Sequence, residues 1–187
     1  MEEPDGQPMV TAASVRQWAE QSLEALGEAR AAIDALNVFP VPDGDTGTNM
    51  FLTFEAACAA VAEACDQTPS ASLERVADAM TTGALLGSRG NSGVILAQIV
   101  KGVASVLAEA GDRAAFDADL VRAALQRASD QAYAAVAHPV EGTILTIARE
   151  AAQAARDCPS QHLVDVVETA VQAGHEALDR TPDLLPV

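Results

Sequence analysis

Apolar residues recur along most of this chain at intervals of three and four, the spacing that places them on one face of a helix. The pattern is most regular near the C-terminal end, where one predicted face carries Leu163, Val166, Val167, Ala170, Val171, Gly174, Ala177 and Leu178. Comparable spacing predicts further helices over residues 11–36, 46–65, 72–86, 91–110, 117–136 and 143–157. The period of two that marks a half-buried strand occurs nowhere. The pattern therefore predicts an all-α protein, and 187 residues suit a single domain.

Helix-breaking and capping residues stand between these segments. They are Pro40 and Pro42, Gly111, Asp117, the His138-Pro139 pair, Pro159 and Pro182. We expect Asp117 to cap the fifth helix and Pro182 to end the last one. Residues 1–9 predict a flexible tail, and residues 10–187 a single folded domain. The abrupt apolar stretch at 184–187 leads us to expect a domain excised from a longer multidomain protein.

Short connections between successive helices favour an antiparallel, up-and-down bundle. In such a bundle, alternate loops lie at the same end. The loops at 37–47, 87–91 and 138–143 follow the first, third and fifth helices, so all three should share one end. They are also the three loops richest in Gly, Pro and small polar residues. Topology and chemistry together predict a functional site at that end.

Composition narrows the function. The net charge of −16, with Lys101 the single lysine, argues against nucleic acids and anionic lipid surfaces as partners, because both require clustered cations. Apolar stretches are interrupted by charged or amide residues before the ~20 residues of a membrane span, so none is expected. Cys58, Cys65 and Cys158 lack metal-ligand spacing and predict buried thiols in a reducing, cytoplasmic setting.

The first loop carries the most informative chemistry. Asp43 and Asp45 flank Gly44, which lets two carboxylates face one point, and hard cations such as Mg²⁺ take oxygen ligands. A helix begins directly afterwards, and free N–H groups at a helix N-terminus attract phosphate. The residues expected there to hold a nucleotide are Thr46, Gly47, Thr48 and Asn49. The competing interpretation is an ordinary capping turn in which Asp45 or Thr46 caps the helix.

The second and third loops offer further anion-binding groups. The nucleotide-binding candidates of the second loop are Ser88, Gly90, Asn91, Ser92 and Gly93, and the alternative is a plain glycine-rich turn. Arg89 could contact phosphate or form a structural ion pair, the role we favour. In the third loop, Thr143 either binds nucleotide or caps the next helix, and Glu141 is a candidate to support the metal shell.

The sequence shows neither a Ser/His/Asp set nor an activated cysteine, which disfavours a nucleophilic hydrolase. Phosphoryl transfer requires mainly positioning and charge neutralisation, which a metal and N–H donors supply. The residues alone therefore predict a Mg-ATP site.

Residues 36–50, 87–96 and 139–145 closely resemble three motifs of the N-terminal ATP-binding domain of bacterial fatty acid kinase. That domain is similar to the nucleotide-binding L subunit of dihydroxyacetone kinase. The resemblance implies an eight-helix, up-and-down α-barrel with ATP or ADP and two Mg²⁺ ions at one end. It implies that Asp43 and Asp45 are the metal ligands and catalytic residues. Asn37 is the nearest counterpart of a third metal-binding aspartate, with one residue more in the spacing.

The resemblance also implies a substrate and partners. A separate fatty-acid-binding protein would present a carboxylate, the kinase would convert it to an acyl phosphate, and further C-terminal domains would contact that partner and form a homodimer. We expect this chain alone to bind ATP without turning substrate over. The alternatives are the ATP-binding subunit of a dihydroxyacetone-type kinase and a non-catalytic module that holds ADP.

Overall fold

The structure is a computed structural model that describes residues 9–37, 42–68, 70–112 and 115–185. These residues form seven helices and no strand; Met9 and Ala115 make an isolated bridge. The helices are α1 (Ala12–Ala35), α2 (Thr46–Gln67), α3 (Leu73–Leu86), α4 (Gly90–Ala110), α5 (Ala118–Ala134), α6 (Ile144–Asp157) and α7 (Leu163–Leu184). The all-α prediction is confirmed.

Local sequence explains where the helices begin. The side chains of Thr11, Ser72, Asp117 and Thr143 each accept a hydrogen bond from an N–H in the first turn of α1, α3, α5 and α6. Asp117 therefore caps the fifth helix as predicted. Asp45 precedes α2 without a capping bond from its side chain. The predicted capping turn at Asp45 is thus not formed by its carboxylate.

The prediction that Pro182 ends the last helix is wrong, because α7 continues to Leu184 with Pro182 inside it. A proline removes the N–H that would bond the carbonyl four residues earlier. The Thr181 hydroxyl instead donates to the Leu178 carbonyl at 2.7 Å, which satisfies that acceptor. The lost backbone bond therefore costs little in the final turn.

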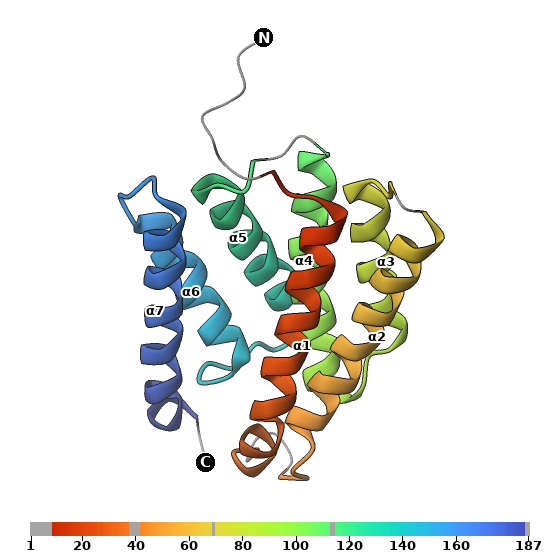
Figure 1. Cartoon of the computed structure of the whole chain (residues 1–187). Coiled ribbons are helices and arrows are strands. Elements are labelled where there is room, and N and C mark those ends of the chain that lie inside the picture. The colour runs from red at the N-terminus through yellow and green to blue at the C-terminus, as the bar shows by residue number, and fades with distance from the viewer. Residues whose placement is uncertain (1–8, 38–41, 69, 113–114, 186–187) are drawn as a thin grey trace.

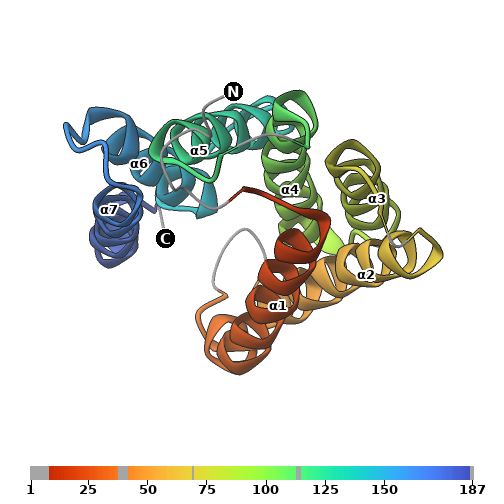
Figure 2. The ribbon, with the colours of Figure 1, turned by 45° about the horizontal axis from the view of Figure 1, so that its top comes forward.

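Successive helices alternate in direction, as Figure 1 shows, and pack as a curved row with α1 and α7 at its two edges (Figure 2). Each helix packs against the next, α2 also contacts α4, and α5 also contacts α7. No contact joins α1 to α7 among the helices as described. The eight-helix barrel implied by the resemblance is therefore not matched in helix number, since the described residues account for seven helices in an open row.

Small residues bring the helices close together. A Cβ on Gly102 of α4 would lie 2.5 Å from the Ala128 Cα of α5, so only glycine permits this approach. α4 is also apolar, with a mean hydropathy of 1.6 over 18 of its 21 residues, enough by length and composition alone to cross a membrane. It packs against α2, α3 and α5, and Ala97, Val100 and Ala104 are buried in the main core. These contacts are those of a core helix.

Candidate functional site

The described parts of the three loops singled out by sequence lie at the same end of the bundle. In Figure 1 this is the lower end, where α2, α4 and α6 begin and α1, α3, α5 and α7 finish. The N-termini of three helices therefore point their free N–H groups toward one end of the molecule. The prediction that the three loops share one end of the bundle is confirmed by the topology.

The described part of the first loop places Asn37 beside Asp43. The Asn37 amide donates to Asp43 Oδ1 at 2.7 Å, and Asn37 Oδ1 is buried without a partner among the described residues. Gly44 has φ +66°, a conformation that lets the chain turn between the two aspartates. A buried amide oxygen next to a carboxylate is a donor set that suits a hard cation. In the part of the chain described here, no three His, Cys, Asp or Glu residues group closely enough to hold a metal by themselves.

The first turn of α2 is joined to the last turn of α1. Asp34 accepts the Thr48 N–H at 3.0 Å on one carboxylate oxygen and the Thr48 hydroxyl at 2.8 Å on the other. These bonds, led by the Thr48 N–H, lower the pKa of Asp34 below its ordinary value. Arg30 Nε also donates to the Thr48 hydroxyl oxygen at 2.9 Å. The hydroxyl and N–H of Thr48, expected to meet phosphate, are thus engaged by α1.

The second loop contacts the first turn of α2. The Ser92 hydroxyl donates to the Thr46 carbonyl at 3.4 Å, and a Cβ on Gly90 would lie 2.5 Å from Asn49 Nδ2. Gly90 also has φ +56°, a backbone conformation that favours glycine. Gly93 lies against the Asn49 carbonyl. Predicted site residues 40 or more positions apart in sequence are therefore side by side.

A buried hydroxyl fixes this junction. Thr53 of α2 is fully buried, donates to the Asn49 carbonyl at 2.7 Å and accepts the Arg89 N–H at 3.1 Å. The Arg89 side chain has no ion-pair partner among the described residues, so the structural ion pair that we favoured is not seen. Ser88 donates to the Leu85 carbonyl, and Asn91 is exposed in the first turn of α4.

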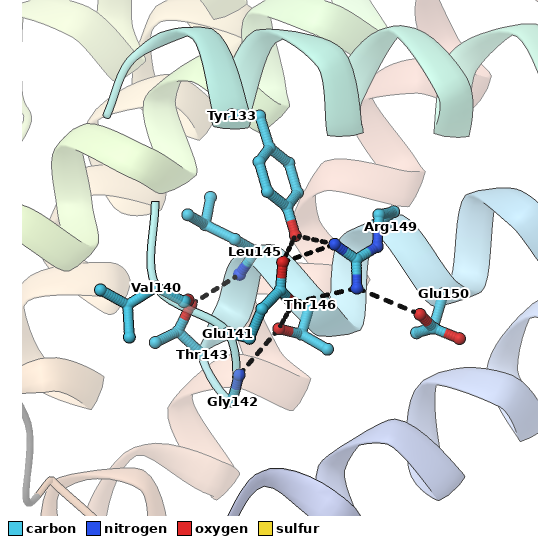
Figure 3. Close-up of polar contacts among 9 residues, drawn as sticks. All are labelled: Tyr133, Val140, Glu141, Gly142, Thr143, Leu145, Thr146, Arg149 and Glu150. Atoms are coloured by element: carbon cyan, nitrogen blue, oxygen red, sulfur yellow. Dashed lines mark hydrogen bonds and ion pairs between the residues drawn. The ribbon is translucent and has the colours of Figure 1, made fainter. Parts of the chain in front are cut away.

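The third loop is held by a separate network, which we call the Glu141 network (Tyr133, Glu141, Thr146 and Arg149; Figure 3). The Glu141 carboxylate accepts from Thr146 Oγ1 at 2.6 Å, from both terminal nitrogens of Arg149 at 2.5 and 2.9 Å, and from the Tyr133 hydroxyl at 3.3 Å. Arg149 is the main cause of a lowered Glu141 pKa. The carboxylate proposed to support a metal shell is thus saturated by protein donors.

Thr143 was predicted either to bind nucleotide or to cap the next helix, and in the structure it caps α6. Its hydroxyl donates to the Val140 carbonyl at 2.8 Å and accepts the Leu145 N–H at 3.3 Å. The neighbouring Gly142 packs on the end of α7, where a Cβ would lie 2.8 Å from the Thr181 carbonyl. The described contacts therefore tie this loop to α5, α6 and α7 and do not join it to the other two loops.

Two surface hollows lie away from the three loops. One, of about 290 Å³, lies between α5 and α6 and is lined only by polar residues, among them Tyr133, Arg149 and Arg156. The other, of about 320 Å³, lies between α2 and α3. Neither is lined by a residue of the predicted nucleotide site.

The DAK2 domain family model matches residues 40–187, which include most of the first loop and all of the second and third. This chain belongs to the DAK2 domain family. The domain is 43% identical over 177 residues to protein YloV of Bacillus subtilis, a match that covers 92% of this chain and 31% of YloV. Uncharacterised proteins of Staphylococcus epidermidis and Staphylococcus aureus (strain USA300) are 39% and 37% identical, with 89% of this chain covered in each match. This DAK2 domain spans about a third of the length of these relatives.

Sequence reasoning missed several polar residues that organise the site. Asp34, Arg30 and Thr53 lie inside helical segments, where their types are unremarkable, and the structure alone pairs them with the loops. The one available signal was the position of Asp34, three residues before Asn37 in the last predicted turn of the first helix. Tyr133 and Arg149 gave no signal, because their partnership depends on how α5 packs against α6.

Proposed function

We propose that this DAK2 domain binds Mg-ATP at the loop end and transfers the γ-phosphate to a fatty acid carboxylate presented by a separate fatty-acid-binding protein. Membership of the kinase-related DAK2 family supports phosphoryl transfer as the type of reaction, without specifying the substrate. The main support for the site is the contact between the first turns of α2 and α4. Ser92 contacts Thr46 there, and Gly90 lies against Asn49. Two oxygen- and N–H-rich loops thereby meet at one place.

The residues present suit the metal. Asp43 and Asp45 would supply carboxylates, and the Asn37 oxygen, which has no hydrogen-bond partner among the described residues, lies beside Asp43. Mg²⁺, when bound, neutralises charge on the transferring phosphoryl group. In a chain with net charge −16 and a single lysine, few side-chain cations could do so instead.

The protein's own contribution is to position the phosphates. The N–H groups at the start of α4 follow Arg89, which caps that helix without a side-chain bond, so these donors can face an anion. Asn91 is exposed beside them, and the Arg89 guanidinium is not engaged by a carboxylate among the described residues. These groups would orient the terminal phosphates. The fatty acid carboxylate would attack the γ-phosphorus from the partner's side, and ADP would leave as the bond from the γ-phosphorus to the bridging oxygen breaks.

The first test is binding. Asp43→Ala and Asp45→Ala should each abolish Mg-dependent ATP binding in a calorimetric titration while leaving the helical circular dichroism unchanged. Asp78→Ala, which removes an exposed aspartate from α3, is the matched control and should bind as the wild type does. Unchanged affinity in both loop variants would remove the metal assignment.

The second test concerns the reaction. We expect no turnover by the domain alone. A protein with the full length of the relatives and carrying this domain should form an acyl phosphate, trapped as a hydroxamate, only with a lipid-loaded partner. Rapid ATP hydrolysis by the isolated domain would contradict this. Phosphorylation of a small ketone would favour the dihydroxyacetone-type alternative, and ADP held without any transfer would favour the non-catalytic module.

A further inference from the structure

The loop that carries Asp43 and Asp45 leaves α1 after residue 36 and enters α2 at Thr46, so its two ends must be brought together. Asp34 and Thr48 lie on either side of these ends. Both Asp34 oxygens bond to Thr48, one to its N–H and one to its hydroxyl, and both bonds are partly buried. The pair therefore connects the last turn of α1 to the first turn of α2 at the base of the loop.

The surrounding packing supports the same junction. Gly47 is buried against the Arg30 carbonyl, where the backbones come too close to admit a side chain. Arg30 adds a hydrogen bond to Thr48, and its guanidinium lies 5.6 Å from the centre of the Phe51 ring. The Asp34 carbonyl lies 3.8 Å from where a Cβ of Gly44 would be, so the aspartate-bearing turn itself reaches back to Asp34.

From this arrangement we infer that Asp34 is a positioning residue, which through Thr48 closes the base of the aspartate loop and holds Asp43 and Asp45 in their binding arrangement. The inference rests on the proposed Mg-ATP site. Asp34 does not serve as a third metal-binding aspartate, because both its oxygens are engaged by Thr48. Fixing both ends of a short loop reduces the ordering that metal binding would otherwise require.

The principal variant is Asp34→Asn, which keeps the size of the side chain and loses the charge and one acceptor. Because residues that orient metal ligands typically affect affinity by about 10–100-fold, we expect Mg-ATP binding to weaken by at least tenfold. Thr48→Val should produce a loss of similar size. The double variant should lose little more than either single variant, since both remove the same contact.

Asp112→Asn is the matched control. Asp112 accepts the Leu73 N–H at 2.7 Å, so it too is a carboxylate bonded to the first turn of another helix, but at the opposite end of the bundle. A role limited to stability would lower the melting temperature of both Asn variants and leave Mg-ATP affinity unchanged in both. The inference requires that only Asp34→Asn weakens binding.

Hydrogen exchange in the nucleotide-free protein separates this inference from the proposed function. Asp34→Asn should speed exchange at the amides of residues 43–49, and unchanged exchange there would overturn the inference whatever the nucleotide does. Additive losses in the Asp34/Thr48 double variant would also overturn it, since each residue would then contact the ligand independently. Absence of Mg-ATP binding by the wild type would instead overturn the proposed function, with faster exchange still showing that Asp34 orders the loop.

Discussion

At the scale of single residues, Glu141 shows how one carboxylate can organise a loop. It accepts hydrogen bonds from Tyr133 of α5 and from Thr146 and Arg149 of α6. These bonds, with Arg149 first, hold the pKa of Glu141 below its ordinary value. Because this pKa is lower in the folded than in the unfolded chain, the contribution to stability is present above the unfolded value and is lost as the pH falls through the folded pKa.

Glu141→Gln should therefore reduce the loss of stability on acidification below about pH 4, near the ordinary pKa of a glutamate. Urea unfolding at pH values from about 7 to about 2.5 measures this effect. The free energy of unfolding should fall less steeply with decreasing pH in Glu141→Gln than in the wild type. Glu109→Gln removes a more exposed bidentate pair with Arg127 and is the control, with little expected effect on stability at any pH because exposed ion pairs contribute little. A Glu141→Gln curve parallel to the wild type would contradict the expectation.

At the scale of helices, glycine decides how closely neighbours approach. Gly102 of α4 lies against the backbone of α5, where a Cβ would meet Ala128 N at 2.6 Å and Arg127 O at 2.7 Å. Gly174 of α7 has room, since a Cβ there would lie 3.7 Å from Ile147. Both glycines have a helical backbone conformation, each in its own helix, and they differ in how close the neighbouring helix lies.

Gly102→Ala should destabilise the fold by about 1–3 kcal/mol, because α4 and α5 must separate to admit the methyl group. Gly174→Ala should instead stabilise it by about 0.5–1 kcal/mol, because alanine favours a helix and the contact there is ordinary. Urea unfolding of the two variants measures both effects. Equal shifts in the same direction would show that the backbone approach between α4 and α5 is not close.

At the scale of the whole molecule, the described core is divided in two. The larger cluster is shared by helices α1, α2, α3 and α4, and its residues Val61, Val76 and Met80 are fully buried. The smaller one joins α5 to α7 through Ala118, Ala155, Val166 and Ala170. Since α7 is an edge of the open row and does not contact α1, and since the α5–α7 cluster is the smaller one, α6 and α7 have fewer buried apolar partners. Local opening should therefore begin there.

Native-state hydrogen exchange should show the amides of α6 and α7 opening at a lower free energy than those of α2 to α4. Val166→Ala and Val76→Ala each shorten a fully buried valine, one in each cluster, and each should cost about 2 kcal/mol locally. We expect Val166→Ala to lower mainly the free energy at which α6 and α7 open. Val76→Ala should lower the free energy of global unfolding. A single opening free energy for all helices would mean that the two clusters unfold as one.

Much of the fold was predictable because its causes are local in sequence. The helical segments follow from apolar spacing, and Thr11, Ser72, Asp117 and Thr143 cap helices through bonds within a few residues. The up-and-down order then followed from short connections. Placement of the three loops at one end could be deduced before any coordinates were known, since it depends only on the parity of the helices.

The partners of individual polar groups could not be deduced in this way. Asp34 and Thr48 are 14 residues apart on two helices, and Glu141, in the loop between α5 and α6, meets Tyr133 of α5 and Arg149 of α6. The sequence predicted that Glu141 supports a metal and that Thr48 binds phosphate. In the structure both side chains are hydrogen-bonded to residues of neighbouring helices. Pro182 was expected to end a helix, but the Thr181 hydroxyl compensates for the missing N–H. Such outcomes depend on side-chain geometry that periodicity does not encode.

The amino-acid sequence by itself therefore determined the helical class, the helix boundaries to within a few residues, and the end of the bundle where oxygen-rich loops gather. Periodicity, capping and chain direction are local or topological properties, which a single chain carries in its order of residues. Only the tertiary structure decided which carboxylates remain available for a ligand and that the row of helices stays open between α1 and α7. Those depend on distances between segments that are remote in sequence, and packing alone sets these distances.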